Sequence, residues 1–135
     1  MAVTSVFVNL PVKDVQRSRA FFGALGYSFD ERFSDEKSAC LVLKEESIFA
    51  MLLAEPFFKG FIKKEIADTA STTEVITALA AESREEVARL VDTALASGGS
   101  PASDTMEEGP MYVRSFQDPD GHHWEVVYMD MSAMQ

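Results

Sequence analysis

The chain has 135 residues, 47% of them hydrophobic and 25% charged, which is typical of one soluble globular domain. Its formal net charge of −10 excludes the basic surfaces that bind nucleic acid or anionic membranes. The longest apolar run, residues 48–54, is far too short to span a bilayer. With one cysteine, Cys40, and no visible secretory signal, we expect a cytoplasmic protein without an internal disulfide.

The first half of the sequence predicts a strand, a helix and three further strands. The opening strand covers residues 5–10 and is expected to end at Pro11. Asp14 is well placed to cap a helix that begins at the next residue and stops near Gly26. The three strands that follow are predicted at residues 27–33, 38–44 and 47–54.

The second half predicts the same order of elements. A strand over residues 74–80 precedes a capping box formed by Ser83 and Glu86, which opens an amphipathic helix. Gly98 and Gly99 end that helix. Three more strands are predicted at residues 102–106, 111–116 and 123–129. We therefore predict two copies of a β-α-β-β-β unit.

A long connection over residues 56–72 separates the two copies. Four large apolar side chains lie within its residues 57–62, which argues against disorder. The connection is either functional, as a lid over a pocket or as a contact between subunits, or it is a loop that packs its aromatic side chains on a sheet edge. We expect a single domain over residues 1–135, with modules at approximately 1–55 and 73–135.

The residues from 118 to 129 combine a turn with a strand. Asp118-Pro119-Asp120-Gly121 is a strong turn-forming sequence, because Pro fixes φ and Gly accepts a positive φ. The following strand carries Glu125 among apolar and aromatic residues. A carboxylate in a strand is costly to bury unless it is paired or hydrogen-bonded. Glu125 is therefore either a surface residue or part of a site.

The doubled unit, the opening Asn9-Leu10-Pro11-Val12-Lys13-Asp14 and the closing Asp118-Pro119-Asp120-Gly121…Glu125 together resemble the vicinal oxygen chelate superfamily, which includes glyoxalases, bleomycin resistance proteins and extradiol dioxygenases. The resemblance implies an α+β fold in which two β-α-β-β-β modules form a curved, mostly antiparallel sheet around a concave pocket, with helices outside. It also implies a small-molecule ligand and a homodimer.

Enzymes of this superfamily hold a divalent metal with His, Glu or Gln from four strands. Carried over by position, the first ligand falls on Phe7 and the second nearest to Met51, neither of which suits such a site. The third falls on Glu74 or Ile76, a choice that the sequence leaves open. The fourth falls on Glu125. The resemblance thus implies an incomplete metal site with Glu125 and Glu74 as its candidates.

Several other side chains are candidates for ligand binding. His123 shares a strand face with Glu125, because side chains alternate along a strand. Tyr112 and Arg114 either face the pocket, where Arg114 would pair with Glu125 or a ligand carboxylate, or face solvent. Phe7, Asn9 and Met51 would form the pocket floor, and Trp124 would pack beneath a helix.

The leading hypothesis from the sequence is a small-molecule binding protein that needs no cofactor, with Glu125 as its key carboxylate. If Glu125 is buried beside apolar groups it could act as a general base in a metal-independent isomerase or epimerase. The alternative is a metal-dependent lyase or isomerase resembling lactoylglutathione lyase, or an extradiol-dioxygenase-like enzyme. Whether the protein is an enzyme stays open at this stage.

Overall fold

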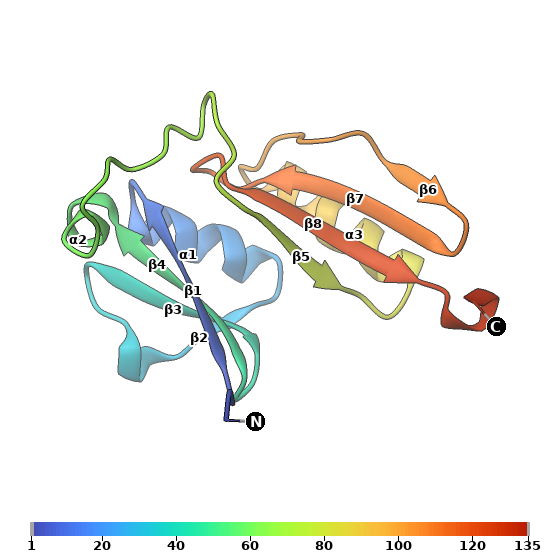
Figure 1. The fold of residues 1–135 in the computed structure, drawn as a ribbon, viewed down its shortest axis with the longest axis horizontal. Coiled ribbons are helices and arrows are strands. Elements are labelled where there is room, and N and C mark those ends of the chain that lie inside the picture. The colour runs from blue at the N-terminus through green and yellow to red at the C-terminus, as the bar shows by residue number, and fades with distance from the viewer. Residues whose placement is uncertain (1, 135) are drawn as a thin grey trace. The chain divides into compact units, whose positions relative to one another are not determined.

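The computed structural model describes residues 2–134 and divides the chain into two compact units, residues 1–66 and 67–135. Each unit is a helix on a four-stranded mixed sheet, as the ribbon shows (Figure 1). The two sheets have the same topology, β1-β4-β3-β2 and β5-β8-β7-β6, with one parallel and two antiparallel pairings in each. The predicted α+β fold with two β-α-β-β-β modules is confirmed.

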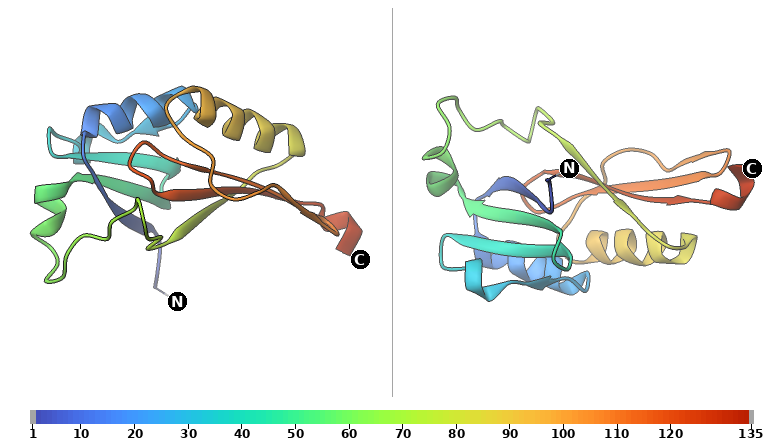
Figure 2. Two further views of the ribbon diagram at one scale, coloured as in Figure 1. Left: turned by 90° about the horizontal axis from the view of Figure 1, so that it is seen from above. Right: turned by 60° about the horizontal axis from the view of Figure 1, so that its bottom comes forward.

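The first unit contains β1 (Val6–Val12), α1 (Val15–Ala24), β2 (Ser28–Phe29), η1 (Glu31–Phe33), β3 (Ser38–Lys44), β4 (Ile48–Ala54) and α2 (Glu55–Lys59). Helix α1 begins where the sequence predicts, because the Asp14 side chain accepts a hydrogen bond from Arg17 N. It lies on one face of the sheet (Figure 2) and buries Phe21 and Phe22 there. Side chains of this size each stabilise the fold by about 1.5–3 kcal/mol when fully buried.

Three boundaries in the first unit differ from the prediction. Strand β1 continues through Pro11 to Val12, because β1 is an edge strand and the missing N–H of Pro11 need not face a neighbour. The strand predicted over residues 27–33 is broken after Phe29, since the Asp30 side chain accepts from Arg32 N and caps the 3₁₀ turn η1. The connection after β4 begins with the short helix α2, which the sequence did not predict.

The second unit contains β5 (Ile76–Ala80), α3 (Arg84–Ala96), β6 (Met106–Glu108), β7 (Met111–Gln117), β8 (His123–Met129) and the 3₁₀ turn η2 (Met131–Met134). The Ser83 side chain caps α3 by accepting from Glu86 N. Helix α3 covers one face of the sheet (Figure 2). Its side chains Val87, Val91 and Ala94 are buried there. The weak strand predicted at residues 102–106 is displaced to β6. Within the described range no helix is long and apolar enough to cross a membrane.

Candidate functional site

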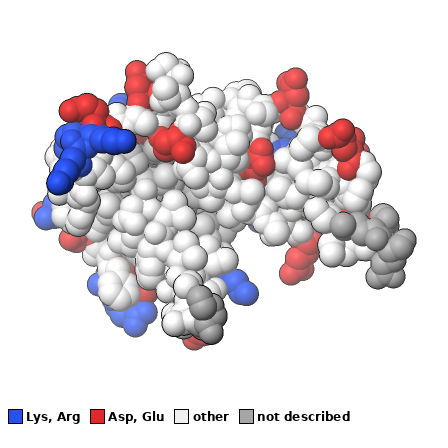
Figure 3. Space-filling view, viewed as in Figure 1, with Lys and Arg blue, Asp and Glu red and all other residues white. Residues whose placement is uncertain are grey.

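Strand β8 carries the candidate site on the sheet face that α3 leaves uncovered. Side chains alternate along the strand, so His123 and Glu125 share one face, whereas Trp124 and Val126 lie on the other. Trp124 and Val126 are fully buried beneath α3, as the sequence predicts for Trp124. Figure 3, drawn from the same side as Figure 1, shows Asp and Glu side chains scattered over the second unit.

The imidazole of His123 and the carboxylate of Glu125 form the polar centre of this face. His123 Nε2 lies 4.0 Å from Glu125 Oε2, too far for a hydrogen bond. The two side chains are 13% and 27% exposed. His123 Nε2 itself is buried and has no hydrogen-bond partner among the described residues. Because buried ring nitrogens are normally paired, the missing partner singles out this atom as a candidate contact for a ligand.

The turn that precedes β8 is held by the buried side chain of Asp118. Its Oδ1 accepts from the backbone N–H groups of Asp120 and His122, and its Oδ2 accepts from Trp124 Nε1 at 3.0 Å. Burial raises the pKa of Asp118, while His122 and these three donors act in the opposite direction. The sequence marked Asp118 only as a turn residue. Its role as a buried acceptor follows from the tendency of Asp to hydrogen-bond backbone N–H groups two residues on.

A segment before β5, residues 67–75, which we call the strap, is attached to this turn at two points. Thr69 Oγ1 donates to the carbonyl oxygen of Asp120 at 2.5 Å. Glu74 Oε1 lies 3.1 Å from Nδ1 of His122, which is 2% exposed. The turn also needs glycine at position 121, where φ is 81° and the strap passes close by. The turn and the strap thus form one hydrogen-bonded structure.

The pairing of Glu74 with His122 bears on the predicted metal ligands. Glu125 and Glu74 are the predicted metal candidates, and His123 shares the face of Glu125. Glu74, however, contacts the buried His122, which precedes β8. Between residues 2 and 134 no cluster of three or more His, Cys, Asp or Glu side chains is arranged to hold a metal. The structure therefore does not bring these three residues together.

Tyr112 and Arg114 lie on the helix-covered face of the second sheet. Arg114 Nη1 is 3.0 Å from Asp92 Oδ1 of α3, and Arg84 stacks over the Tyr112 ring at 4.0 Å. Arg114 is opposite Val126 in the ladder, whereas Glu125 is opposite Ser115. Of the two alternatives left open for Arg114, the one in which it faces the pocket and pairs with Glu125 is wrong, because this register sends the two side chains to opposite faces.

In the first unit Phe7, Asn9 and Met51 share the sheet face that α1 does not cover. Phe7 is 47% exposed and stacks on Phe49 with ring centroids 4.7 Å apart. Asn9 is paired in register with Met51. Asn9 and Leu53 line a cavity of about 320 Å³ together with Phe58, Phe61 and Ile62 of α2 and the connection after it. The aromatic connection therefore contributes to an apolar pocket next to Asn9, one of the predicted binding residues.

Comparisons with known proteins agree with this architecture. Residues 4–43 match the family model of the bleomycin resistance protein-like N-terminal domain. The hypothetical protein SA1046 from S. aureus is 23% identical, with a TM-score of 0.78 over 95% of both chains. A glyoxalase/bleomycin resistance protein/dioxygenase family enzyme from Burkholderia phytofirmans is 17% identical, with a TM-score of 0.74 over 92% of this chain and 97% of that one.

The chain has the glyoxalase/bleomycin resistance fold. This confirms the resemblance predicted from the sequence. Lactoylglutathione lyase from Agrobacterium tumefaciens shares the fold at 16% identity, with a TM-score of 0.65 over 91% of each chain. No curated protein matches the sequence significantly.

The repeat within the glyoxalase/bleomycin resistance fold relates the strand positions of the two units to one another. In the first unit Phe7 is paired with Phe49, and Met51 follows two residues later. In the second unit Ile76 is paired in the same parallel register with His123. Ile76 is therefore the counterpart of Phe7, and of the two residues left open for the third implied ligand position, Ile76 is the one in the equivalent register.

Phe49 and His123 are counterparts in the two units, and Met51 and Glu125 each follow two residues later. The fourth ligand position that the resemblance implies therefore falls on Glu125. Of the four positions only Glu125 offers a hard oxygen donor, because the two opening-strand positions are hydrocarbon and the thioether of Met51 is a soft ligand. Glu74 lies two residues before the equivalent position and is bound to His122. A catalytic metal needs about three protein ligands. The side chains at these four positions do not fit a catalytic metal.

Proposed function

We propose that the protein binds a small organic molecule without a metal, on the uncovered face of the second sheet. The observation that carries this proposal is the buried, unpartnered Nε2 of His123 beside the partly exposed carboxylate of Glu125. Binding sites for small molecules combine an apolar lining with a few polar groups that fix orientation. Glu125 and His123 would supply those polar groups.

The donor set argues against the alternative, a metal-dependent lyase or dioxygenase. On this face a hard divalent cation would have Glu125 and, at most, His123 as protein ligands, fewer than the roughly three that a catalytic metal needs. The likeness to lactoylglutathione lyase concerns the fold, which hosts several chemistries. We therefore derive no metal-dependent step for this chain.

Metal content and thermal stability test the proposal directly. The protein is purified without chelators, its Mn, Fe, Ni and Zn are quantified, and the melting temperature is measured with each ion. We expect no stoichiometric metal and no stabilisation by these ions. Stoichiometric metal that is lost in Glu125→Ala and kept in Glu108→Ala, an exposed glutamate of β6, would contradict the proposal and support the lyase.

A metabolite screen by thermal shift then identifies ligands. A molecule that binds only the folded protein stabilises it by RT ln(1 + [L]/Kd), so a ligand at 100 times its Kd adds about 2.7 kcal/mol. The stabilisation should fall in Glu125→Ala and remain in Glu108→Ala. A ligand that stabilises both variants equally would place binding elsewhere in the molecule.

A further inference from the structure

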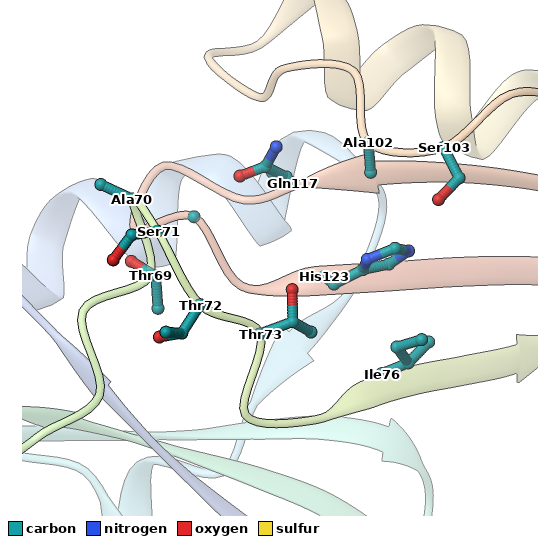
Figure 4. Close-up of a pocket in the computed structure, with 11 residues that line it drawn as sticks. Thr69, Ala70, Ser71, Thr72, Thr73, Ile76, Ala102, Ser103, Gln117 and His123 are labelled. Carbon is teal, nitrogen blue, oxygen red and sulfur yellow. The ribbon is translucent and has the colours of Figure 1, made fainter.

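The second unit contains a cavity of about 470 Å³ between the strap, the end of β7 and the start of β8. Figure 4 shows the His123 ring within it, with Ala102 and Ser103 on one side and Thr73 and Ile76 on the other. At 30 Å³ per molecule the cavity holds roughly 15 waters, so a ligand of about a dozen heavy atoms fits.

Hydroxyl groups dominate the lining of this cavity. Four threonine or serine residues of the strap contribute, and Ser103 and the amide of Gln117 lie across from them. Thr69 and Thr72 already donate to backbone carbonyl groups, which leaves their oxygen lone pairs to accept from a ligand. The methyl groups of Ala70 and Ala102 and the side chain of Ile76 supply apolar patches between the polar groups.

The electrostatics of the cavity select against charged ligands. None of the eleven lining residues is Lys, Arg, Asp or Glu. Two carboxylates lie next to lining residues: Asp68 Oδ1 accepts from Ala70 N at 3.0 Å, and Glu125 Oε2 lies 4.0 Å from His123 Nε2. The chain as a whole has a net charge of −10. An anion would therefore find no counter-charge and would be repelled. A strong cation would find no carboxylate in the lining itself, because Asp68 and Glu125 lie next to lining residues and not among them.

We propose, on the basis of the function proposed above, that this cavity binds a neutral polyhydroxylated molecule of about monosaccharide size. His123 Nε2 forms a hydrogen bond with one ligand hydroxyl, which satisfies the buried atom that has no partner in the protein. The strap hydroxyls and Gln117 bind the remaining hydroxyl groups. The C–H faces of the ligand rest on Ile76 and the two alanines.

A two-dimensional ¹H–¹⁵N NMR titration of the full chain tests the proposal, with glucose and myo-inositol as neutral probes and glucuronate as a charged probe of the same size. We expect the neutral probes at tens of millimolar to shift amide signals of residues 69–73, 102–103 and 121–123, with glucuronate giving much smaller shifts. His123→Leu should weaken binding roughly three- to tenfold, the effect of one lost hydrogen bond. The control Thr105→Val removes an exposed hydroxyl outside the lining and should bind as the unchanged protein does.

Other outcomes separate this proposal from the general function. If neither glucose nor myo-inositol shifts these signals, or if glucuronate binds more tightly than glucose, the proposed class of neutral polyhydroxylated ligands is wrong. The general proposal of small-molecule binding then still stands. Shifts confined to Asn9 and Phe58, which line the cavity of the first unit, would also overturn this assignment and keep the function. If His123→Leu retains a well-dispersed spectrum and unchanged affinity, His123 is not the anchor. Stoichiometric metal would overturn both proposals.

Discussion

Gly121→Ala tests the close contact between the turn and the strap. At this position φ is 81°, and an added Cβ would lie 2.8 Å from Thr69 Oγ1 and 3.1 Å from Thr69 Cβ. Gly109→Ala is a matched control in the same unit, because φ is also positive there, at 57°, and the added Cβ meets no atom of the structure within 4 Å. The two substitutions therefore share the backbone strain and differ in the contact with Thr69.

The expected cost follows from these two contributions. A left-handed conformation costs a non-glycine residue about 1–2 kcal/mol, so Gly109→Ala should lower the free energy of unfolding by about that amount. Forcing a methyl group into a packed site adds about 1–3 kcal/mol. Gly121→Ala should therefore cost about 2–5 kcal/mol in total. Part of the cost of Gly121→Ala beyond that of Gly109→Ala should disappear in the Thr69→Ala background, where Oγ1 is absent.

Urea denaturation followed by tryptophan fluorescence measures these free energies. Trp124 is the only tryptophan of the chain and is buried in the second unit, so its emission reports the unit that carries both glycines. Equal costs for Gly121→Ala and Gly109→Ala, within about 0.5 kcal/mol, would refute the contact between strap and turn. An excess cost that does not change in the Thr69→Ala background would refute the role of the Thr69 hydroxyl.

Two further substitutions and one pH dependence follow from the same unit. Asp118→Asn should cost about 1–3 kcal/mol, because an amide cannot accept from Trp124 Nε1 and from the backbone donors at once; urea denaturation that finds no loss would contradict this. Because burial raises the pKa of Asp118 above 3.8, its stabilising contribution is full below that pH and is lost as the pH rises through the folded pKa. The stability difference between the unchanged protein and Asp118→Asn should therefore shrink from acidic to neutral pH, and a difference that grows would mean a lowered pKa. Ser83→Ala should cost about 1 kcal/mol through loss of the α3 cap, with Ser97→Ala, at the other end of α3, as the control in the same assay.

The sequence predicted the two modules well, because caps and apolar periodicity are local signals. Asp14 and Ser83 both cap helices as expected. The sequence could not place Arg114, since an alternating strand gives two faces but does not say which one a helix covers. The structure shows that Arg114 lies on the face covered by α3, because it forms an ion pair with Asp92 of that helix.

The candidate site was partly predictable. His123 and Glu125 share a face because of strand alternation, which the sequence contains. The choice between Glu74 and Ile76 depended on the parallel register of β5 with β8, which joins residues far apart in the chain. Long-range pairing of this kind leaves no local signal in a single sequence.

The attachments of the strap also bear on the order of folding. Thr69 and Glu74 bind residues that lie 51 and 48 positions further along the chain. The β7–β8 hairpin, by contrast, joins neighbouring strands through the short turn at Asp118. Because closing a long loop costs entropy before its contacts form, we expect the hairpin to form early and the strap to dock late. Substitutions such as Thr69→Ala should then accelerate unfolding and leave the folding rate nearly unchanged.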